Sequence, residues 1–454
     1  MKLTSTKARE ATRIVRALRE SGYSAYLVGG CVRDLLLDRE PADYDVATSA
    51  TPNEVMRLFP QTYAVGAQFG VVLVPVRRDH EDGTRENYAI EVATYRSDGH
   101  YSDGRHPDMV QFSSSAQFDV QRRDFTINGL LLDPVGLEVL DFVGGQADLK
   151  HGIVRAIGDP HRRFSEDKLR MLRAVRFAAR FNYTIEQQTF AAIRELASQI
   201  HQVSRERVRE ELLKILTEGH ARRAFELLDL TGLLEQVLPE VKKMQGVEQP
   251  PQFHPEGDVW VHTLLLLEGL PAGVSKTLAL GVLLHDVGKP PTFRIAPDRI
   301  RFDQHAEVGT RMAAEICHRF RMSNDETEQV CALVANHMRF GDVKRMKEST
   351  LKRFLRLPCF EEHLELHRLD CLSSHRDLSL YSYARQRFET MPEDEIRPAP
   401  LITGNDLIAA GYKPGPQFKD LLLAVEDAQL EGSIRNKEDA LGLVKRKVAQ
   451  EQST

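Results

Sequence analysis

The chain has 454 residues, of which 42% are hydrophobic and 28% charged, and its net charge is −5. That length predicts about three domains with room for hydrophobic cores, and the absence of any apolar run of about 18 residues argues against a membrane protein. The N-terminus lacks the apolar core of a signal peptide, and five scattered cysteines favour a reducing cytoplasm over disulfides or a zinc knuckle.

The first 22 residues predict a helix that buries Ala8, Ile14, Val15 and Leu18. A short apolar run, Tyr26-Leu27-Val28, then predicts a strand that ends at Gly29 and Gly30. The next segment has helical spacing and carries Arg33 in its first turn. A strand, a glycine turn and a helix start can together present backbone N–H groups to a phosphate, and glycine lets the backbone approach closely.

Two carboxylates follow in the segment Asp43-Tyr44-Asp45-Val46. In a strand, Asp43 and Asp45 would point to the same face, where like charges repel. A divalent cation makes that arrangement favourable, and carboxylate oxygens suit Mg²⁺. A phosphate-binding turn beside metal-binding carboxylates indicates nucleotidyl transfer. An ordinary turn followed by a solvated acidic loop is the simpler alternative.

The segments GGCVRD and DYD resemble the signature of class II tRNA nucleotidyltransferases and bacterial poly(A) polymerases. The resemblance implies a nucleotidyltransferase in which Gly29, Gly30 and Arg33 hold the triphosphate, and Asp43 and Asp45 hold Mg²⁺.

Thr51 and Pro52 predict a helix start, and two strands are predicted at Leu73–Val76 and Tyr88–Thr94. Glu91 lies among strand-forming residues in the second of them. The family has an acid at this place, so the resemblance implies a third catalytic carboxylate, whereas a solvent-facing position is the alternative.

The Gly- and Asp-rich segment 97–105 predicts a loop. The resemblance implies that Asp103 and Arg105 belong to a flexible segment that reshapes the nucleotide pocket; a plain surface loop is the alternative. The segment RRDFTIN closely matches the family motif. We expect Arg123 to bind triphosphate oxygens, and Asp124 and Asn128 to bind the nucleotide; a surface ion-pair cluster is the alternative.

The segment from Arg155 to Arg223 holds 15 Lys and Arg against 9 Asp and Glu, which suggests a surface that faces phosphates. We expect Ser165 to cap a new helix that continues through Glu166 and Asp167. One basic stripe follows at helical spacing: Arg170, Arg173, Arg176 and Arg180. An amphipathic helix with internal ion pairs is the simpler alternative.

EDKLR resembles the EDxxR motif of the family, with which the protein chooses a nucleotide without a nucleic-acid template. The carboxylate of Asp167 can accept the exocyclic amino group of C or A, and the guanidinium of Arg170 can donate to a ring nitrogen or O2. Neither contact suits the carbonyl-bearing face of U or G. The resemblance assigns Arg173 and Arg176 to the same nucleotide-binding helix.

A second site is predicted after the Pro-rich segment 249–251. His285 and Asp286 end an apolar helix, and more histidines surround them in sequence, which favours a metal site over a core histidine. HDVGK resembles the HD phosphohydrolase superfamily. The resemblance implies a divalent metal (Ni, Mn or Mg) held by His262, His285, Asp286 and Asp370. His305 and His337 are able to hold a second metal.

The predicted fold class is α+β. We expect a nucleotidyltransferase domain with a small sheet over 1–145, a helical RNA- and nucleotide-binding domain over 146–248, an HD domain over 249–390 and a helical tail over 391–454. The tail carries Lys445, Arg446 and Lys447, which suggests contact with tRNA.

The expected function is addition of CCA, or part of it, to tRNA 3′ ends from CTP and ATP, in the cytoplasm and away from membranes. Three alternatives stay open: a poly(A) polymerase or an A-adding or CC-adding enzyme, an HD phosphohydrolase, and a non-catalytic RNA-binding protein. The sequence does not indicate an oligomeric state.

Overall fold

The structure is a computed structural model that describes residues 3–64, 70–79, 85–98, 110–252 and 254–451. Its contacts divide the chain into two compact units, Met1–Pro239 and Glu240–Thr454. The boundary lies close to the Pro-rich segment 249–251. The four-domain division made from the sequence stays a prediction.

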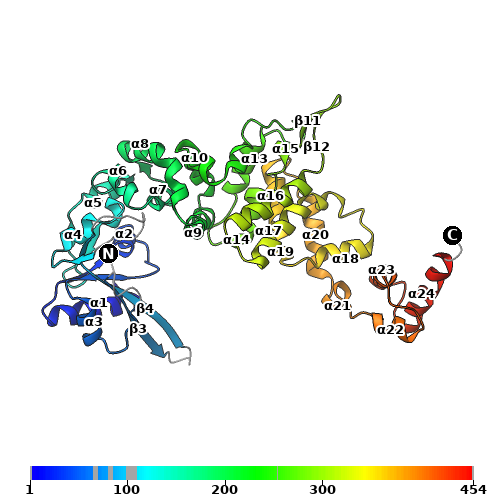
Figure 1. The fold of residues 1–454 in the computed structure, drawn as a ribbon, viewed down its shortest axis with the longest axis horizontal. Helices are drawn as coiled ribbons and strands as arrows, with labels where there is room; N and C mark the ends of the chain where they lie inside the picture. The colour runs from blue at the N-terminus through cyan, green and yellow to red at the C-terminus, as the bar shows by residue number, and fades with distance from the viewer. Residues whose placement is uncertain (1–2, 65–69, 80–84, 99–109, 253, 452–454) are drawn as a thin grey trace. The chain divides into compact units, whose positions relative to one another are not determined.

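A six-stranded mixed sheet forms the base of the first unit, with strand order β3-β4-β2-β1-β7-β8. The long strands β3 and β4 lie side by side in antiparallel register, whereas β4 pairs with β2 in parallel (Figure 1). Both predicted strands are therefore confirmed. The strands of the first unit are β1 (Ala25–Val28), β2 (Asp45–Thr48), β3 (Val71–Asp79), β4 (Arg85–Thr94), β5 (Arg96–Asp98), β6 (Val110–Phe112), β7 (Leu130–Leu132), β8 (Val139–Asp141), β9 (Ile153–Val154) and β10 (Thr184–Ile185).

Helices precede, separate and follow the strands of this sheet, and mainly helices continue the unit after β8, so the predicted α+β class is confirmed. They are α1 (Thr6–Glu20), α2 (Gly30–Leu36), α3 (Pro52–Leu58), α4 (Ala116–Gln121), η2 (Thr126–Asn128), α5 (Gly145–His151), α6 (Pro160–Glu166), α7 (Leu169–Arg180), α8 (Gln187–Leu196), η3 (Ala197–Gln202), α9 (Arg205–Thr217), α10 (Ala221–Leu230) and α11 (Leu233–Val237); α12 (Pro239–Lys242) lies at the unit boundary.

Two helix starts follow directly from local sequence. Helix α1 buries the four apolar positions predicted for it, and Ser5 caps its N-terminus. Helix α3 begins with a capping box between Thr51 and Glu54, with Pro52 in the first turn. The four buried positions of α1 and the helix start predicted at Thr51 and Pro52 are confirmed. The start could be predicted because a cap depends on residues only three positions apart.

The helix start predicted at Ser165 is wrong. Asp159 and Pro160 cap and open α6 earlier in the chain, so Ser165 and Glu166 form its last turn. Asp167 then adopts an extended conformation and its carboxylate accepts the N–H of Leu169, where α7 begins. The upstream Asp-Pro pair is a stronger start signal than a lone serine.

Helix α7 is held against α9 by buried ion pairs. Arg176, 7% exposed, donates to Glu211, 3% exposed, and reaches Glu218, which also pairs with Arg180. Removing one partner from such a buried pair costs about 3–5 kcal/mol, since the other charge is left without compensation. The basic stripe of α7 is thus largely neutralised within the protein.

The second unit is mainly helical. Helix α14 packs against α17 and α19, and a two-stranded ribbon of β11 and β12 follows α15 (Figure 1). Its elements are α13 (Val259–Glu268), α14 (Lys276–Leu284), α15 (Lys289–Thr292), β11 (Phe293–Ile295), β12 (Ile300–Phe302), α16 (His305–Arg319), α17 (Asn324–Asn336), η4 (His337–Asp342), α18 (Glu348–Leu355), α19 (Phe360–Ser373), α20 (Ser379–Thr390), α21 (Glu393–Ile396), α22 (Gly404–Ala409), α23 (Gln417–Leu430) and α24 (Lys437–Glu451). Within the described ranges, no helix is long and apolar enough to cross a membrane.

Candidate functional site

The predicted glycine turn joins β1 to α2. Gly29 has φ +78°, in the region that favours glycine, and it precedes the first residue of α2. A Cβ atom at Gly29 would lie 3.2 Å from an Nη atom of Arg123, so the turn and this guanidinium are direct neighbours. Arg123 also pairs with the buried Asp119 at 3.1 Å, which orients it. Two elements far apart in sequence, both predicted to bind phosphate, thus lie together.

The carboxylates gather on neighbouring strands. Asp45 begins β2 and lies in register with Glu91 of β4, so the two side chains share a face of the sheet. Asp43 precedes the strand, which is shorter than predicted, and its exposed carboxylate lies 3.5 Å from Nζ of Lys7. Burial and the negative charges of Glu91 and Asp43 raise the pKa of Asp45 to about 6, against the opposing effect of Arg123.

This repulsion is what a divalent cation would relieve, so the three carboxylates fit the metal that the sequence predicts. In the described part of the chain, their ligand atoms do not all come within 4.8 Å of one another. Lys7, which the sequence analysis did not single out, also donates to the carbonyl of Ala42 beside Asp43. Nothing in the local sequence of an amphipathic helix indicates that its lysine will contact a distant carboxylate.

Arg33 is buried, and its contact with the triphosphate stays a prediction. It is 5% exposed, and its guanidinium donates to Asp34 at 2.8 Å and to the amide oxygen of Asn128 at 2.7 Å. Its face lies over the ring of Phe181, 4.6 Å from the centroid. Arg33 is therefore fully engaged inside the protein, beneath the glycine turn.

Asn128 continues this hydrogen-bond chain by donating to Asp124 at 3.1 Å. The other oxygen of Asp124 accepts two bonds from Arg173 at 2.8 and 2.6 Å. Burial alone would raise the pKa of Asp124, but the charge and hydrogen bonds of Arg173 hold it well below its usual range. The predicted nucleotide-binding residues Arg33, Asn128, Asp124 and Arg173 thus form one connected network.

Asp167 and Arg170 have separate partners. Asp167 accepts from both Nη atoms of Arg207, at 3.2 and 2.7 Å, and Arg170 donates to Glu166 at 2.8 Å. Arg207 lies in α9 and was not among the predicted site residues. Asp103 and Arg105 lie outside the described residues.

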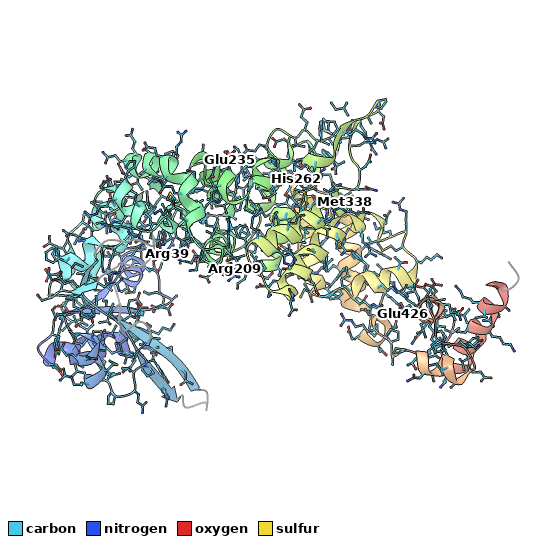
Figure 2. All side chains as sticks on the ribbon, in the orientation of Figure 1. Arg39, Arg209, Glu235, His262, Met338 and Glu426 are labelled. Carbon is cyan, nitrogen blue, oxygen red and sulfur yellow. The ribbon has the colours of Figure 1, made fainter. Side chains whose placement is uncertain are left out.

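The second unit brings six predicted residues into two adjacent groups. In each group, one ligand atom from every member lies within 4.8 Å of the others: His262, His285 and Asp370 form one, and Asp286, His305 and His337 the other. Figure 2 labels His262, which α13 contributes to the interior of this unit. Nε2 of His262 lies 3.4 Å from Nε2 of His285 and 3.2 Å from Asp370.

Asp286, a member of the second group, also contacts the first group. One of its oxygens, Oδ2, lies 3.2 Å from Nε2 of His285 and 2.6 Å from Nζ of Lys289. The other, Oδ1, faces His305 at 3.6 Å and His337 at 3.7 Å, and it is buried without a hydrogen-bond partner among the described residues. A buried carboxylate oxygen and converging ring nitrogens are the donor set of a divalent transition metal, so these residues fit metal binding.

Burial opposes the charged ring of His262, but hydrogen bonds with Asp370 and Glu256 raise its pKa to about 9. Burial lowers the pKa of His337 to about 4. A cavity of about 430 Å³ opens beside these groups and is lined in part by Lys289, Phe302, His305, Met338 and Asp370. Glu256, which accepts hydrogen bonds from both His254 and His262, was not predicted from the sequence.

Comparisons with known proteins cover most of the chain. Residues 25–155 match the family model of the poly(A) polymerase head domain, residues 182–245 that of the probable RNA- and SrmB-binding site of polymerase A, and residues 304–444 that of domain 2 of tRNA nucleotidyltransferases. A CCA-adding enzyme of Levilactobacillus brevis is 33% identical over 94% of this chain and 95% of its own length.

A CCA-adding enzyme of Enterococcus faecalis is 32% identical over 97% of both chains. Among solved structures, that of the Bacillus stearothermophilus CCA-adding enzyme in complex with CTP matches with a TM-score of 0.74 at 26% identity, covering 99% of this chain and 100% of that one.

Proposed function

The chain belongs to the CCA-adding tRNA nucleotidyltransferase family, and we propose on that basis that it adds C and A residues to tRNA 3′ ends from CTP and ATP. The observation that carries the proposal is full-length similarity to a CCA-adding enzyme, at 33% identity over 94% of the chain. The carboxylates of Asp45 and Glu91, in register next to the Gly29 turn, support a metal-dependent nucleotidyl transfer.

Enzymes of this family use divalent metals, and we propose Mg²⁺ as the ion, held by Asp43, Asp45 and Glu91. When bound, Mg²⁺ would favour ionisation of the tRNA 3′ hydroxyl and neutralise the pyrophosphate leaving group. The triphosphate is held by the Gly29-Gly30 turn and by Arg123, whose guanidinium adjoins Gly29.

Arg33, Asp124, Asn128 and Arg173 act in this proposal as one buried scaffold. They connect the glycine turn to α7 through hydrogen bonds of 2.6–3.1 Å. Nucleotide contacts of Asp124, Asn128 and Arg173 would use the donors and acceptors left over from these bonds. The buried ion pair of Arg176 with Glu211 holds α7 in place against α9.

We further propose that Asp167 and Arg170 select the base. A nucleotide would replace Arg207 and Glu166 as their partners, since both pairs are partly accessible to solvent. All five cysteines are free, which supports a cytoplasmic location.

Asp167→Ala should lower the kcat/KM for CTP and ATP by roughly 5- to 150-fold, because a base amino group without its acceptor loses about 1–3 kcal/mol. Discrimination against UTP and GTP should fall with it. Incorporation of each nucleotide, measured separately, checks this. Glu195→Ala, which removes an exposed acid from α8, is the control and should change neither value. Unchanged discrimination in Asp167→Ala would contradict the assigned role.

The function itself is tested by incubating the purified protein with a tRNA that lacks its CCA end, together with labelled CTP, ATP or both. At most three nucleotides should be added, and both nucleotides should be required for the full product. Long A tracts would instead identify a poly(A) polymerase, and addition of only CC or only A would identify one of the partial enzymes.

A second candidate activity is metal-dependent phosphoester hydrolysis in the second unit, and the buried, unpartnered Oδ1 of Asp286 favours it. We propose that His262, His285, Asp286 and Asp370 hold one divalent ion (Ni, Mn or Mg), and that His305 and His337, with Asp286, hold another. A metal in such a site supplies an activated water for attack on phosphorus. Lys289 and the adjoining cavity would bind the phosphoester.

A further inference from the structure

Glu256 lies behind the first group of the second unit, on the side of His262 away from His285. Its Oε1 atom lies 2.7 Å from Nδ1 of His262 and 2.9 Å from Nδ1 of His254. The side chain is only 7% exposed, and His262 is completely buried. A carboxylate so deep in a helical unit costs free energy unless it is paired, and both rings pair with its Oε1 atom. Among the described residues, the Oε2 atom has no hydrogen-bond partner.

The two nitrogens of the His262 ring face different partners. Nδ1 faces Glu256, whereas Nε2 faces Asp370 at 3.2 Å and His285 at 3.4 Å. An ionised carboxylate can only accept, so Nδ1 carries the hydrogen. The hydrogen bond therefore leaves the Nε2 lone pair available on the side of His285 and Asp370 whenever the ring is neutral.

Glu256 also holds the neighbouring ring. His254 and His262 pack edge to face with centroids 4.9 Å apart, and His254 lines the cavity beside the two groups. One carboxylate oxygen thus fixes the orientation of a ring inside the group and of a ring in the cavity wall.

A different interpretation is that His254, Glu256 and His262 bind an ion of their own, because their ligand atoms also lie within 4.8 Å of one another. The hydrogen-bond lengths oppose it. Nδ1 of both rings lies at 2.7–2.9 Å from the same oxygen, which is donor-to-acceptor distance, and an ion on Nδ1 of His262 would require that nitrogen to lose its hydrogen.

We propose that Glu256 is a positioning residue of the second unit's metal site, which sets the tautomer and ring orientation of His262 so that Nε2 binds the ion. The proposal rests on the metal site assigned above. Partners of this kind raise the basicity of a histidine ligand, and their removal typically costs about 10- to 100-fold in metal affinity.

The test is Co²⁺ titration of the full chain, followed by calorimetry and by the visible absorption of the bound ion. Asp43→Asn and Asp45→Asn in the parent protein remove two of the three carboxylates proposed to hold Mg²⁺ in the first unit. Glu256→Ala in this parent should weaken Co²⁺ binding roughly 10- to 100-fold without changing the number of ions bound. Glu256→Gln should recover most of the affinity, because its amide oxygen still accepts the Nδ1 hydrogen.

Glu240→Ala is the matched control: it removes another partly buried glutamate of the same unit, one that pairs with Arg319, and it should leave Co²⁺ affinity unchanged. If Glu256→Ala does not fold, Glu256→Met keeps the side-chain volume without an acceptor. Equal affinity in the parent and the Glu256 variants would overturn the positioning role alone. Loss of one whole equivalent of Co²⁺ would make Glu256 a ligand instead, and a parent that binds no Co²⁺ would refute the metal site as well.

Discussion

Asp45→Asn is expected to reduce nucleotide addition on the order of a thousandfold, while the protein stays folded. Asparagine keeps the size of the side chain but removes the charge that, with Glu91 in register beside it, would hold the cation. Loss of a group that stabilises charge in the transition state typically costs about a hundred- to a thousandfold, and here the ion itself is lost. Incorporation of labelled CTP into tRNA measures the effect.

Removal of the charge should also relieve repulsion between Asp45 and Glu91, since that repulsion raises the pKa of Asp45. We therefore expect the melting temperature of Asp45→Asn to be equal to or above that of the unmodified protein. Asp38→Asn is the control: it removes an exposed aspartate just after α2, at a positive φ that asparagine also tolerates. If Asp45→Asn retains more than about a tenth of the activity, Asp45 is not a metal ligand.

His285→Asn is expected to abolish binding of the ion assigned to His262, His285, Asp286 and Asp370, and to reduce any phosphoester hydrolysis in the second unit on the order of a hundredfold or more. The reason is geometric: Nε2 of His285 lies 3.4 Å from Nε2 of His262 and 3.2 Å from Oδ2 of Asp286, so it faces the other ligands proposed for that ion. Nucleotide addition should change by less than about twofold, because the carboxylates that we propose for that reaction belong to the first unit.

The matched control is His363→Asn, which removes another buried histidine of the same unit that lies outside the metal-capable groups. Metal binding by His363→Asn should be unchanged. Hydrolysis of a chromogenic phosphodiester and Mn²⁺ titration give the two readouts. If Asp45→Asn and His285→Asn each eliminate both activities, the two reactions share one site and the assignment of two sites is wrong.

The features that the sequence by itself determined are local ones. The glycine turn, the capping box at Thr51 and the position of His285 at the end of an apolar helix depend on residues within about one helical turn. The failure at Ser165 has the same origin, because the competing start at Asp159 lies six residues upstream, beyond the window of a capping motif. The reaction was then inferred from similarity to CCA-adding enzymes over most of the chain.

The partners of the charged residues were decided only by the tertiary structure. Asp45 faces Glu91 because β2 and β4 pair in parallel, and Arg33 is buried against Asn128 and Phe181. Asp167 pairs with Arg207, 40 residues later in the chain. Glu256 shows the limit most clearly: an isolated glutamate in a loop has no periodicity to mark it, and burial between two histidines gives it a role. Sequence motifs identify which side chains carry the chemistry, whereas packing determines which of them meet, because contacts across a fold are set by chain topology and not by spacing along the chain.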